Sequence, residues 1–332
     1  MSSRKEDHIE LALKSETSPA SLDLRFDYDP VHGSHPKKDE LWPASIAGKS
    51  MNYPVWVSSM TGGANKAKQI NINLAKLCAQ FKLGMGLGSC RKIIEDPSCI
   101  PDFQVRKYLC DQALFANIGI AQCAEWEKSD KLNNILEIIN ICEADGLTIH
   151  LNPMQEWLQS EGDHISEAPI HVIRRIKDKF QFPIIVKEVG QGISMKGLHA
   201  LMQLDLEAIE FGAYGGTNFA SLELMRNSKL VNFNYESLCH VGHTAEQMVQ
   251  YTNQLVSTQE DIHCKKFIIS GGVKNFLDAY YLMSLCNSES IYGMASGLLQ
   301  YALVSYEELE QFFVSQMQGL LLAKSFLKIK SK

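Results

Sequence analysis

The stretch "PVWVSSMTGGANKAKQI", residues 54–70, decides the fold because its character changes halfway along. Its first part is an uninterrupted apolar run, which predicts a strand that is covered on both faces. Its last part opens a helix, predicted over Ala64–Lys82, whose apolar residues recur on one face. Two hydroxyl groups, at Ser58 and Ser59, and a pair of glycines separate the two parts. The stretch is therefore one strand–helix unit with a polar turn at the carboxyl end of the strand.

The same unit recurs along the chain. Seven more short apolar runs are predicted strands, most of them followed by a helical pattern: 83–88, 114–119, 147–151, 183–190, 208–213, 266–272 and 290–296. Eight strands that alternate with helices favour an α/β fold, a (β/α)₈ TIM barrel. A doubly wound open sheet is the alternative, although no G-x-G-x-x-G follows the first strand. The connection over 214–251 is long and is expected to contain an additional helix near the barrel mouth.

Composition restricts the function. The net charge of −6 over 332 residues argues against a nucleic-acid partner, and no apolar run is long enough for a membrane span. The first ten residues are polar, so no signal peptide is expected and the protein is expected in the cytoplasm. Nine cysteines without a C-x-x-C pair predict free thiols. Residues 1–50 are polar and are expected to be an irregular extension or lid, followed by the barrel over 51–332.

Active sites of (β/α)₈ barrels lie at the carboxyl ends of the strands. Each predicted strand end here carries a glycine, a polar group or a charge. The seventh, "IISGGVKN", runs through two glycines into a helix start, where backbone N–H groups and the helix dipole favour an anion. Ser270–Val273, with Met294–Ser296 from the eighth strand end, are therefore the predicted phosphate site. A tight turn with a helix cap is the alternative.

A single lysine, Lys187, interrupts the apolar fifth strand. Burying an ammonium is costly unless it is paired. One interpretation is a structural pair with Glu188, although adjacent strand residues point to opposite faces. The other is a cation beneath a flavin, where it stabilises the negative charge of the reduced ring.

The fourth strand end, "HLNPMQE", groups four polar side chains with one carboxylate among them. They are His150, Asn152, Gln155 and Glu156. One carboxylate with amide neighbours suits Mg²⁺, which takes its remaining ligands from substrate phosphates and water. A solvated loop with an Asn-Pro turn is the alternative.

The strand ends, taken in order, resemble those of the FMN-dependent type 2 isopentenyl-diphosphate isomerase family. The matching motifs are "RKEDHI", "SSMTGG", "GLGS-x-R", "ANIG", "HLNPMQE-x-x-Q-x-EGD", "VKEVG-x-GIS", "GGTNFA", "SGGVKN" and "GMA". They run from residue 4 to about residue 296. The resemblance implies that isopentenyl diphosphate is converted to dimethylallyl diphosphate for isoprenoid biosynthesis. It implies reduced FMN as the acid–base, Mg²⁺, NADPH as the reductant, and a homo-oligomer of four or eight subunits.

The resemblance also assigns residues. Those implied to hold FMN are Met60, Thr61, Gly62, Ser89, Asn117, Lys187, Thr217, Gly271, Gly272, Ala295 and Ser296. Those implied to hold the diphosphate substrate are Arg4, Lys5, Ser89, Arg91, His150, Asn152 and Gln155. Glu156 is implied to bind Mg²⁺, while Gln155 and Lys187 are implied to be catalytic.

The sequence departs from the family pattern at Cys90, Tyr214 and Ser296, and in "CHVGHT" at 239–244. An FMN-dependent 2-hydroxy-acid oxidase or dehydrogenase on the same barrel is the rival function. Such an enzyme pairs a catalytic histidine with an arginine three residues later near the seventh strand. No H-x-x-R occurs around "VGHTAEQM" or "IISGGVKN".

Overall fold

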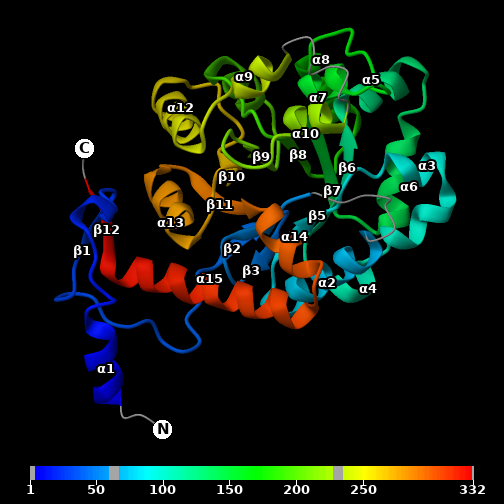
Figure 1. The fold of residues 1–332 in the computed structure, drawn as a ribbon. Coiled ribbons are helices and arrows are strands. Elements are labelled where there is room, and N and C mark those ends of the chain that lie inside the picture. The colour runs from blue at the N-terminus through cyan, green and yellow to red at the C-terminus, as the bar shows by residue number, and fades with distance from the viewer. Residues whose placement is uncertain (1–3, 60–66, 227–234, 331–332) are drawn as a thin grey trace.

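Eight parallel strands close into a barrel in a computed structural model that describes residues 4–59, 67–226 and 235–330. The strands follow one another around the barrel in chain order (Figure 1). They are β4 Val55–Val57, β5 Gly84–Gly86, β6 Leu114–Gly119, β7 Gly146–Leu151, β8 Ile184–Glu188, β9 Ala208–Glu210, β10 Lys266–Ile269 and β11 Glu289–Met294. All eight coincide with predicted strands, so the predicted (β/α)₈ barrel is confirmed.

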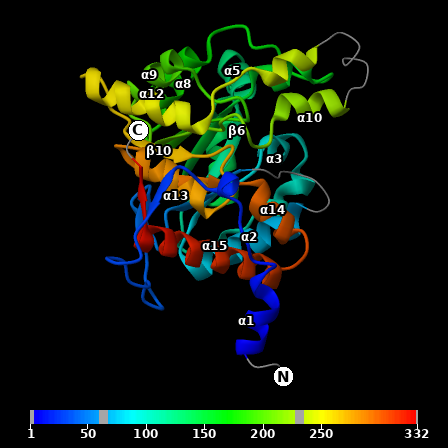
Figure 2. The same cartoon turned by 60° about the vertical axis from the view of Figure 1, so that its left-hand side comes forward.

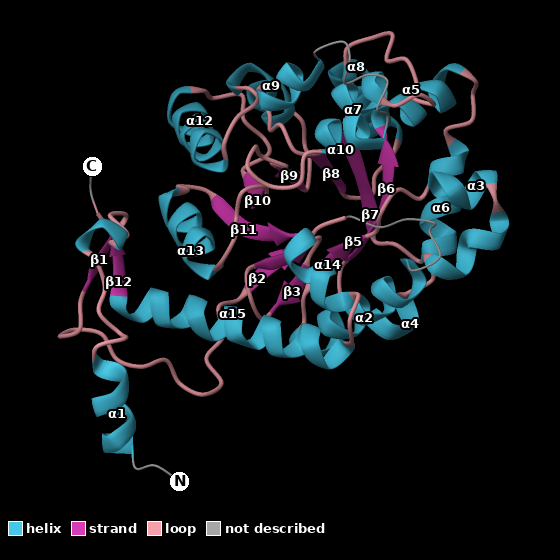
Figure 3. Ribbon diagram, in the orientation of Figure 1, coloured by secondary structure: helices cyan, strands magenta, loops and turns pink. Residues whose placement is uncertain are grey.

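Helices surround the barrel (Figure 3). The longer ones are α2 Ala67–Phe81, α5 Ile120–Lys128, α6 Asn133–Cys142, α8 Pro169–Lys179, α9 Met195–Met202, α12 Ala245–Thr258, α13 Phe276–Leu285 and α15 Tyr306–Phe326. Other helices around the barrel are α3 Arg91–Glu95, α4 Arg106–Leu109, α7 Pro153–Leu158, α10 Phe219–Arg226 and α14 Ser296–Ala302, with 3₁₀ turns at Pro19–Ser21, Pro97–Asp102 and Tyr235–His240. The additional helix expected within 214–251 is α10. No helix in the described ranges is both long and apolar enough to cross a membrane.

A hairpin closes the amino-terminal end of the barrel. β2 (Ala44–Ile46) and β3 (Lys49–Met51) pair antiparallel, and their Ile46 and Met51 side chains are buried against Trp56 inside the barrel. The Glu207 carboxylate accepts a hydrogen bond of 2.8 Å from the Ala47 N–H, which fixes the turn. Because this end is filled by apolar side chains, any ligand site has to lie at the carboxyl ends of the strands.

The first fifty residues are more regular than expected. Residues Arg4–Ala12 form α1, and β1 (Phe26–Tyr28) pairs antiparallel with β12 (Leu327–Ile329). The expectation of an irregular segment is therefore wrong in these places and in the hairpin of β2 and β3. α1 itself buries none of its residues and projects away from the barrel (Figures 1 and 2).

Candidate functional site

A cavity opens at the carboxyl ends of β4 and of β8 to β11. Six residues of the predicted flavin set line it together: Lys187, Thr217, Gly271, Gly272, Ala295 and Ser296. The predicted phosphate residues Ser270–Val273 and Met294–Ser296 lie on the same wall. The structure therefore brings residues from four separate strand ends, as the sequence predicted, into one place. Met60, Thr61 and Gly62 lie outside the described residues.

The loop after β10 requires its glycines. Gly271 and Gly272 have φ values of +84° and +74°, a region that favours glycine. A Cβ atom on Gly271 would lie 2.1 Å from the carbonyl oxygen of Ala213, so a larger residue does not fit. In the part of the chain that the structure describes, the N–H groups of Gly271, Gly272 and Val273 donate no hydrogen bond. Successive free N–H groups of this kind form a concavity that suits an anion.

The helix that follows contributes less than expected. Asn275 caps α13, and its Oδ1 accepts hydrogen bonds from the N–H groups of Leu277 (2.9 Å) and Asp278 (3.1 Å). The first turn of α13 thus has two of its donors occupied already. The N–H groups left for an anion are mainly those of Gly271, Gly272 and Val273, which we call the glycine loop.

Lys187 lies at the bottom of the cavity. Its side chain is buried, and Nζ donates to the backbone carbonyl of Glu188 at 3.0 Å and lies 3.6 Å from a carboxylate oxygen of Glu210. The Glu188 side chain points away and accepts three backbone N–H groups of the following loop at 2.7–2.8 Å. The alternative of a Lys187–Glu188 side-chain pair is therefore wrong.

Glu210 was not singled out from the sequence. Its side chain is fully buried on β9, lines the same cavity, and neither of its oxygens accepts a hydrogen bond from a described residue. Burying a carboxylate without hydrogen-bond donors is costly. A ligand with N–H or O–H groups could supply the missing donors at this end of the cavity. The available signal was a single acid inside the apolar run "AIEFGA".

A hydrogen-bonded pair, Asn117 and His150, lies beside Lys187. The Asn117 Nδ2 donates to the carbonyl of Leu87 at 3.0 Å, so its Oδ1 is the acceptor for His150 Nδ1 at 2.8 Å. Strand pairing sets His150 directly next to Lys187. Burial and then the charge of Lys187 lower the pKa of His150 to about 4. The imidazole is therefore neutral at pH 7, with its proton on Nδ1.

The short helix α7 carries the second polar group. Pro153 starts the helix, and the Asn152 Nδ2 donates to Glu156 Oε1 at 2.8 Å and lies 3.4 Å from Gln155 Oε1. The other Glu156 oxygen accepts the N–H of Asp163 at 2.8 Å. Asn152 Oδ1 is buried and has no hydrogen-bond partner among the described residues. The amide of Asn152 and the carboxylate of Glu156 thus form one hydrogen-bonded group.

Two residues of α10 complete this group and were not found from the sequence. Glu223 is buried and accepts a hydrogen bond of 3.2 Å from Gln155 Nε2. Arg226 bridges Glu223 (2.7 Å) to Glu161 (2.9 Å). The side-chain amide of Gln155 is therefore held from the side of α10. No sequence signal pointed to Glu223, because the helix expected within 214–251 had no predicted bounds or inner face.

The remaining predicted residues lie at the rim or outside the site. Arg91 forms ion pairs with Glu95 and, at 2.6 Å, with Asp163, and the neighbouring Ser89 is exposed. Asp163 in turn contacts Glu156, which links Arg91 to the α7 group. Arg4 and Lys5 are exposed on α1, and the structure does not bring them to the cavity.

The described residues contain no cluster of side chains that would form a metal site by themselves. Within the described ranges, no three histidine, cysteine or acidic side chains lie together as a metal-binding group. Glu156 has the Asn152 amide as its hydrogen-bonded neighbour, and a carboxylate beside an amide oxygen suits a cation whose other ligands come from water and a bound phosphate.

Comparisons with known proteins agree in sequence and in fold. No protein-family profile matches the chain. The isopentenyl-diphosphate delta-isomerase of Picrophilus torridus is 34% identical over 318 residues, covering 93% of this chain and 86% of that protein. The enzyme of the same name from Nostoc sp. is 33% identical over 314 residues, covering 93% and 86%.

Solved structures share the barrel at low identity. Flavocytochrome b2 with sulfite bound superposes with a TM-score of 0.62 at 13% identity, covering 91% of this chain and 72% of that chain. A mandelate oxidase variant with an FMN adduct gives a TM-score of 0.57 at 8% identity, covering 93% and 88%. These two show the fold alone. The sequence relatives, together with the motifs at the strand ends, show that the chain belongs to the type 2 isopentenyl-diphosphate delta-isomerase family.

Proposed function

We propose that this chain converts isopentenyl diphosphate to dimethylallyl diphosphate, using reduced FMN as the acid–base and Mg²⁺, and so supplies isoprenoid precursors. The observation that carries the proposal is the position of Lys187. It shares a cavity with the glycine loop, and it is paired in the sheet with His150 on β7. β7 is followed directly by the α7 group, which consists of Asn152, Gln155 and Glu156. One buried cation thus lies between a place for a cofactor phosphate and a place for a diphosphate substrate. NADPH as the reductant, a tetramer or octamer, and a cytoplasmic location are further parts of the proposal.

The residues present fit FMN. The free N–H groups of the glycine loop suit its phosphate, with Ala295 and Ser296 on the same wall. Lys187 would stabilise the negative charge of the reduced ring, and the Glu210 oxygens, which accept no hydrogen bond from a described residue, would accept ring N–H groups. Bound reduced FMN supplies a proton donor and a proton acceptor to the substrate alkene. The remaining proposed contacts are Thr217, Asn117, Ser89 and Met60–Gly62.

The α7 group fits a diphosphate held through Mg²⁺. Glu156 keeps unused lone pairs on both oxygens, and the unpartnered Asn152 Oδ1 is a second hard oxygen ligand. Arg91 at the rim supplies a guanidinium that binds phosphate oxygens in a fork. His150 Nε2 carries a lone pair in the ligand-free tautomer, so we expect diphosphate binding to favour proton uptake there.

Gln155 serves to orient the substrate carbons. Its amide has no titratable proton, so it positions a reacting group but does not transfer a proton. The chain Gln155–Glu223–Arg226 restricts the rotation of this amide. α7 and α10 pack against each other, and Phe219 at the start of α10 lines the cavity, so the two helices would help to exclude water from the reacting atoms.

The proposal is tested by anaerobic turnover. Purified protein with FMN and Mg²⁺ is given isopentenyl diphosphate in D₂O before and after reduction with dithionite, and product is followed by NMR. We expect deuterated dimethylallyl diphosphate only with the reduced flavin. Lactate and mandelate are supplied in parallel with an electron acceptor. Oxidation of either acid without isomerisation would establish the rival 2-hydroxy-acid oxidase function.

The Mg²⁺ site has its own test. Glu156→Gln removes the charge but keeps an oxygen that accepts the Asp163 N–H, so the fold should persist. We expect a loss of at least about 10-fold in kcat/KM and a weaker response to Mg²⁺, because one charged ligand is lost. FMN affinity should stay unchanged. Glu137→Gln, on the exposed face of α6 and outside this group, is the control. A normal Mg²⁺ response in Glu156→Gln would place the metal elsewhere.

A further inference from the structure

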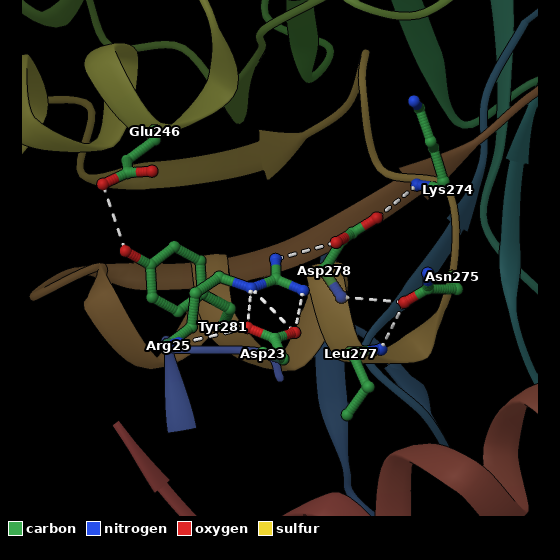
Figure 4. A network of polar contacts seen from close by, with 8 residues as sticks. All are labelled: Asp23, Arg25, Glu246, Lys274, Asn275, Leu277, Asp278 and Tyr281. Carbon is green, nitrogen blue, oxygen red and sulfur yellow. Dashed lines mark hydrogen bonds and ion pairs between the residues drawn. The ribbon is translucent and has the colours of Figure 1, made fainter. Parts of the chain in front are cut away.

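Arg25, in the segment before the barrel, lies at the centre of a polar network beside the glycine loop (Figure 4). Its guanidinium holds Asp23 through two nitrogens, at 2.7 Å and 2.9 Å, and donates from a third to Asp278 on α13 at 2.8 Å. The guanidinium carbon lies 5.1 Å from the ring centres of both Phe26 and Tyr281. All three nitrogens are thus engaged, and two aromatic rings restrict the position of the group.

Asp278 transmits this contact to the loop. One of its carboxylate oxygens binds Arg25, and the other accepts the backbone N–H of Lys274 at 3.0 Å. Lys274 is two residues beyond Gly272 and lines the same cavity as the two glycines. A carboxylate held by a guanidinium on one side keeps a fixed orientation for the N–H on its other side.

The loop over 270–274 has two anchors. At its start, the Ser270 Oγ accepts the N–H of Gly212 at 3.0 Å and the Ser270 carbonyl accepts that of Ala213 at 2.8 Å. At its end, the Lys274 N–H is held by Asp278. Between these anchors lie the free N–H groups that suit a phosphate. The direction in which they point depends on both ends of the loop.

A second cavity confirms that Arg25 is near the loop. This cavity, of about 340 Å³, lies against the glycine loop and is lined by Arg25, Asp278 and Tyr281 together with Gly271, Gly272 and Lys274. The Tyr281 hydroxyl also donates to Glu246 at the start of α12, at 3.1 Å. The network therefore joins three elements around the outer side of the loop.

We propose that Arg25 is a positioning residue for the cofactor phosphate: through Asp278 it fixes the end of the glycine loop that receives the phosphate. This inference rests on the proposed FMN function. It predicts a specific pattern, because in the proposed function the loop contacts the phosphate of the cofactor while Lys187 contacts its ring. Loss of Arg25 should weaken binding of FMN but not of riboflavin, which has the same ring and no phosphate.

The test compares the dissociation constants of FMN and riboflavin by fluorescence in the full chain. We expect Arg25→Ala to reduce the preference for FMN over riboflavin by about 3- to 30-fold. Arg25→Lys, which keeps the charge but not the fork, should restore part of it. Asp278→Asn should reduce the preference for FMN by a similar factor. The double variant Arg25→Ala/Asp278→Asn should show little further reduction. Arg175→Ala is the control, because Arg175 also joins two carboxylates, Glu127 and Glu167, but on α8.

The outcomes separate the inference from the function. A wild-type protein with equal affinity for FMN and riboflavin would contradict the proposed cofactor. A wild-type preference for FMN that Arg25→Ala leaves intact would overturn the role of Arg25 alone. An equal fall in affinity for both ligands would also overturn it, since that pattern indicates general loss of structure. Asp278→Asn gives the same decision if Arg25→Ala does not fold.

Discussion

Lys187 and its neighbours show how a barrel interior can hold charge. Lys187 and Glu210 are adjacent in the strand register, both are buried, and they lie 3.6 Å apart. Each limits the cost of burying the other, although breaking such a pair leaves an uncompensated charge. The cation still faces the cavity and remains available to an anionic ligand.

Lys187→Met should make the reduction potential of bound FMN more negative by about 30–60 mV, since 30 mV of a two-electron couple corresponds to about 1.4 kcal/mol. The reason is that the negative charge of the reduced ring loses its nearest cation. Spectroelectrochemical titration measures the change. Lys266→Met is the control, because Lys266 is also paired with acids but lies at the closed end of the barrel. Equal potentials in wild type and Lys187→Met would place Lys187 outside the flavin contact.

His150 makes stability depend on pH. Its folded pKa of about 4 lies below its value of 6.5 in an unfolded chain. Between these values the unfolded chain binds a proton that the folded protein does not, so the unfolding free energy falls as the pH falls. From about pH 7.5 to about pH 5 this group alone should cost about 2 kcal/mol. Over the same pH range, the unfolding free energy of His150→Asn, measured by urea unfolding, should fall by correspondingly less than that of wild type.

The comparison needs an exposed histidine as its control. His164→Asn should show the wild-type loss, because His164 is exposed on a loop. If His150→Asn and wild type lose the same free energy over this pH range, the imidazole is not held neutral in the folded protein.

The sequence predicts that Lys187, Gly271 and Gly272 lie close together, and the structure has them lining one cavity. Their position follows from local pattern, because each stands at a strand end and parallel strands of a barrel bring their ends together. Glu210 and Glu223 were missed because a carboxylate is ordinarily a surface group. Their burial follows from packing between elements, and a single helix or strand pattern does not contain that information.

Single elements depend on a few hydrogen bonds. The loop after β8 is held by one oxygen of Glu188, which accepts the N–H groups of Gly190, Gln191 and Gly192. Glu188→Ala should lower the unfolding free energy by about 2–4 kcal/mol, because three donors lose a charged acceptor in a buried place. Glu188→Gln keeps one acceptor oxygen and should lose less.

Chemical denaturation measures these differences, with Glu137→Ala on the exposed face of α6 as the control. The control should stay within about 0.5 kcal/mol of wild type. A similar small change for Glu188→Ala would show that the loop is held by other contacts.

At the level of elements, the eight barrel strands were predictable and the hairpin of β2 and β3 was not. The barrel strands are apolar along their whole length because both faces are covered. The hairpin strands have three residues each, and their turn is Ala47–Gly48 with φ values of +51° and +72°. Such turns are ordinarily marked by Asn-Gly or Asp-Gly, and alanine in this conformation gives no sequence signal.

The whole molecule has one part that stands apart from the rest. α1 carries Arg4 and Lys5, buries none of its residues, and projects from the barrel. The contact with the diphosphate that the family resemblance implies for them would therefore require α1 to take another position. The pairing of β1 with β12 was likewise beyond the sequence, because three-residue strands from opposite ends of the chain carry no sign of each other.

Deletion of residues 1–15 should leave the unfolding free energy within about 0.5 kcal/mol of wild type, because the described part of this segment, residues 4–15, is exposed throughout. FMN affinity should also stay unchanged. The value of kcat/KM for isopentenyl diphosphate should fall by at least about 10-fold, because the deletion removes Arg4 and Lys5, the two charged groups that the family resemblance assigns to the diphosphate. Arg4→Ala in the full chain should give part of this effect, and Lys14→Ala none. An unchanged kcat/KM after the deletion would remove both residues from the substrate site.

The pairing of β1 with β12 also determines when the N-terminal segment can complete its folding during synthesis. Phe26 leaves the ribosome long before its partner Ile329, by roughly 15–60 s at about 5–20 residues per second. During that time the segment that carries Arg25 has no strand to join, since the backbone carbonyl of Arg25 accepts its hydrogen bond from Lys330. The segment that carries Arg25 and β1 is thus made early but reaches its final position only after β12 has been made.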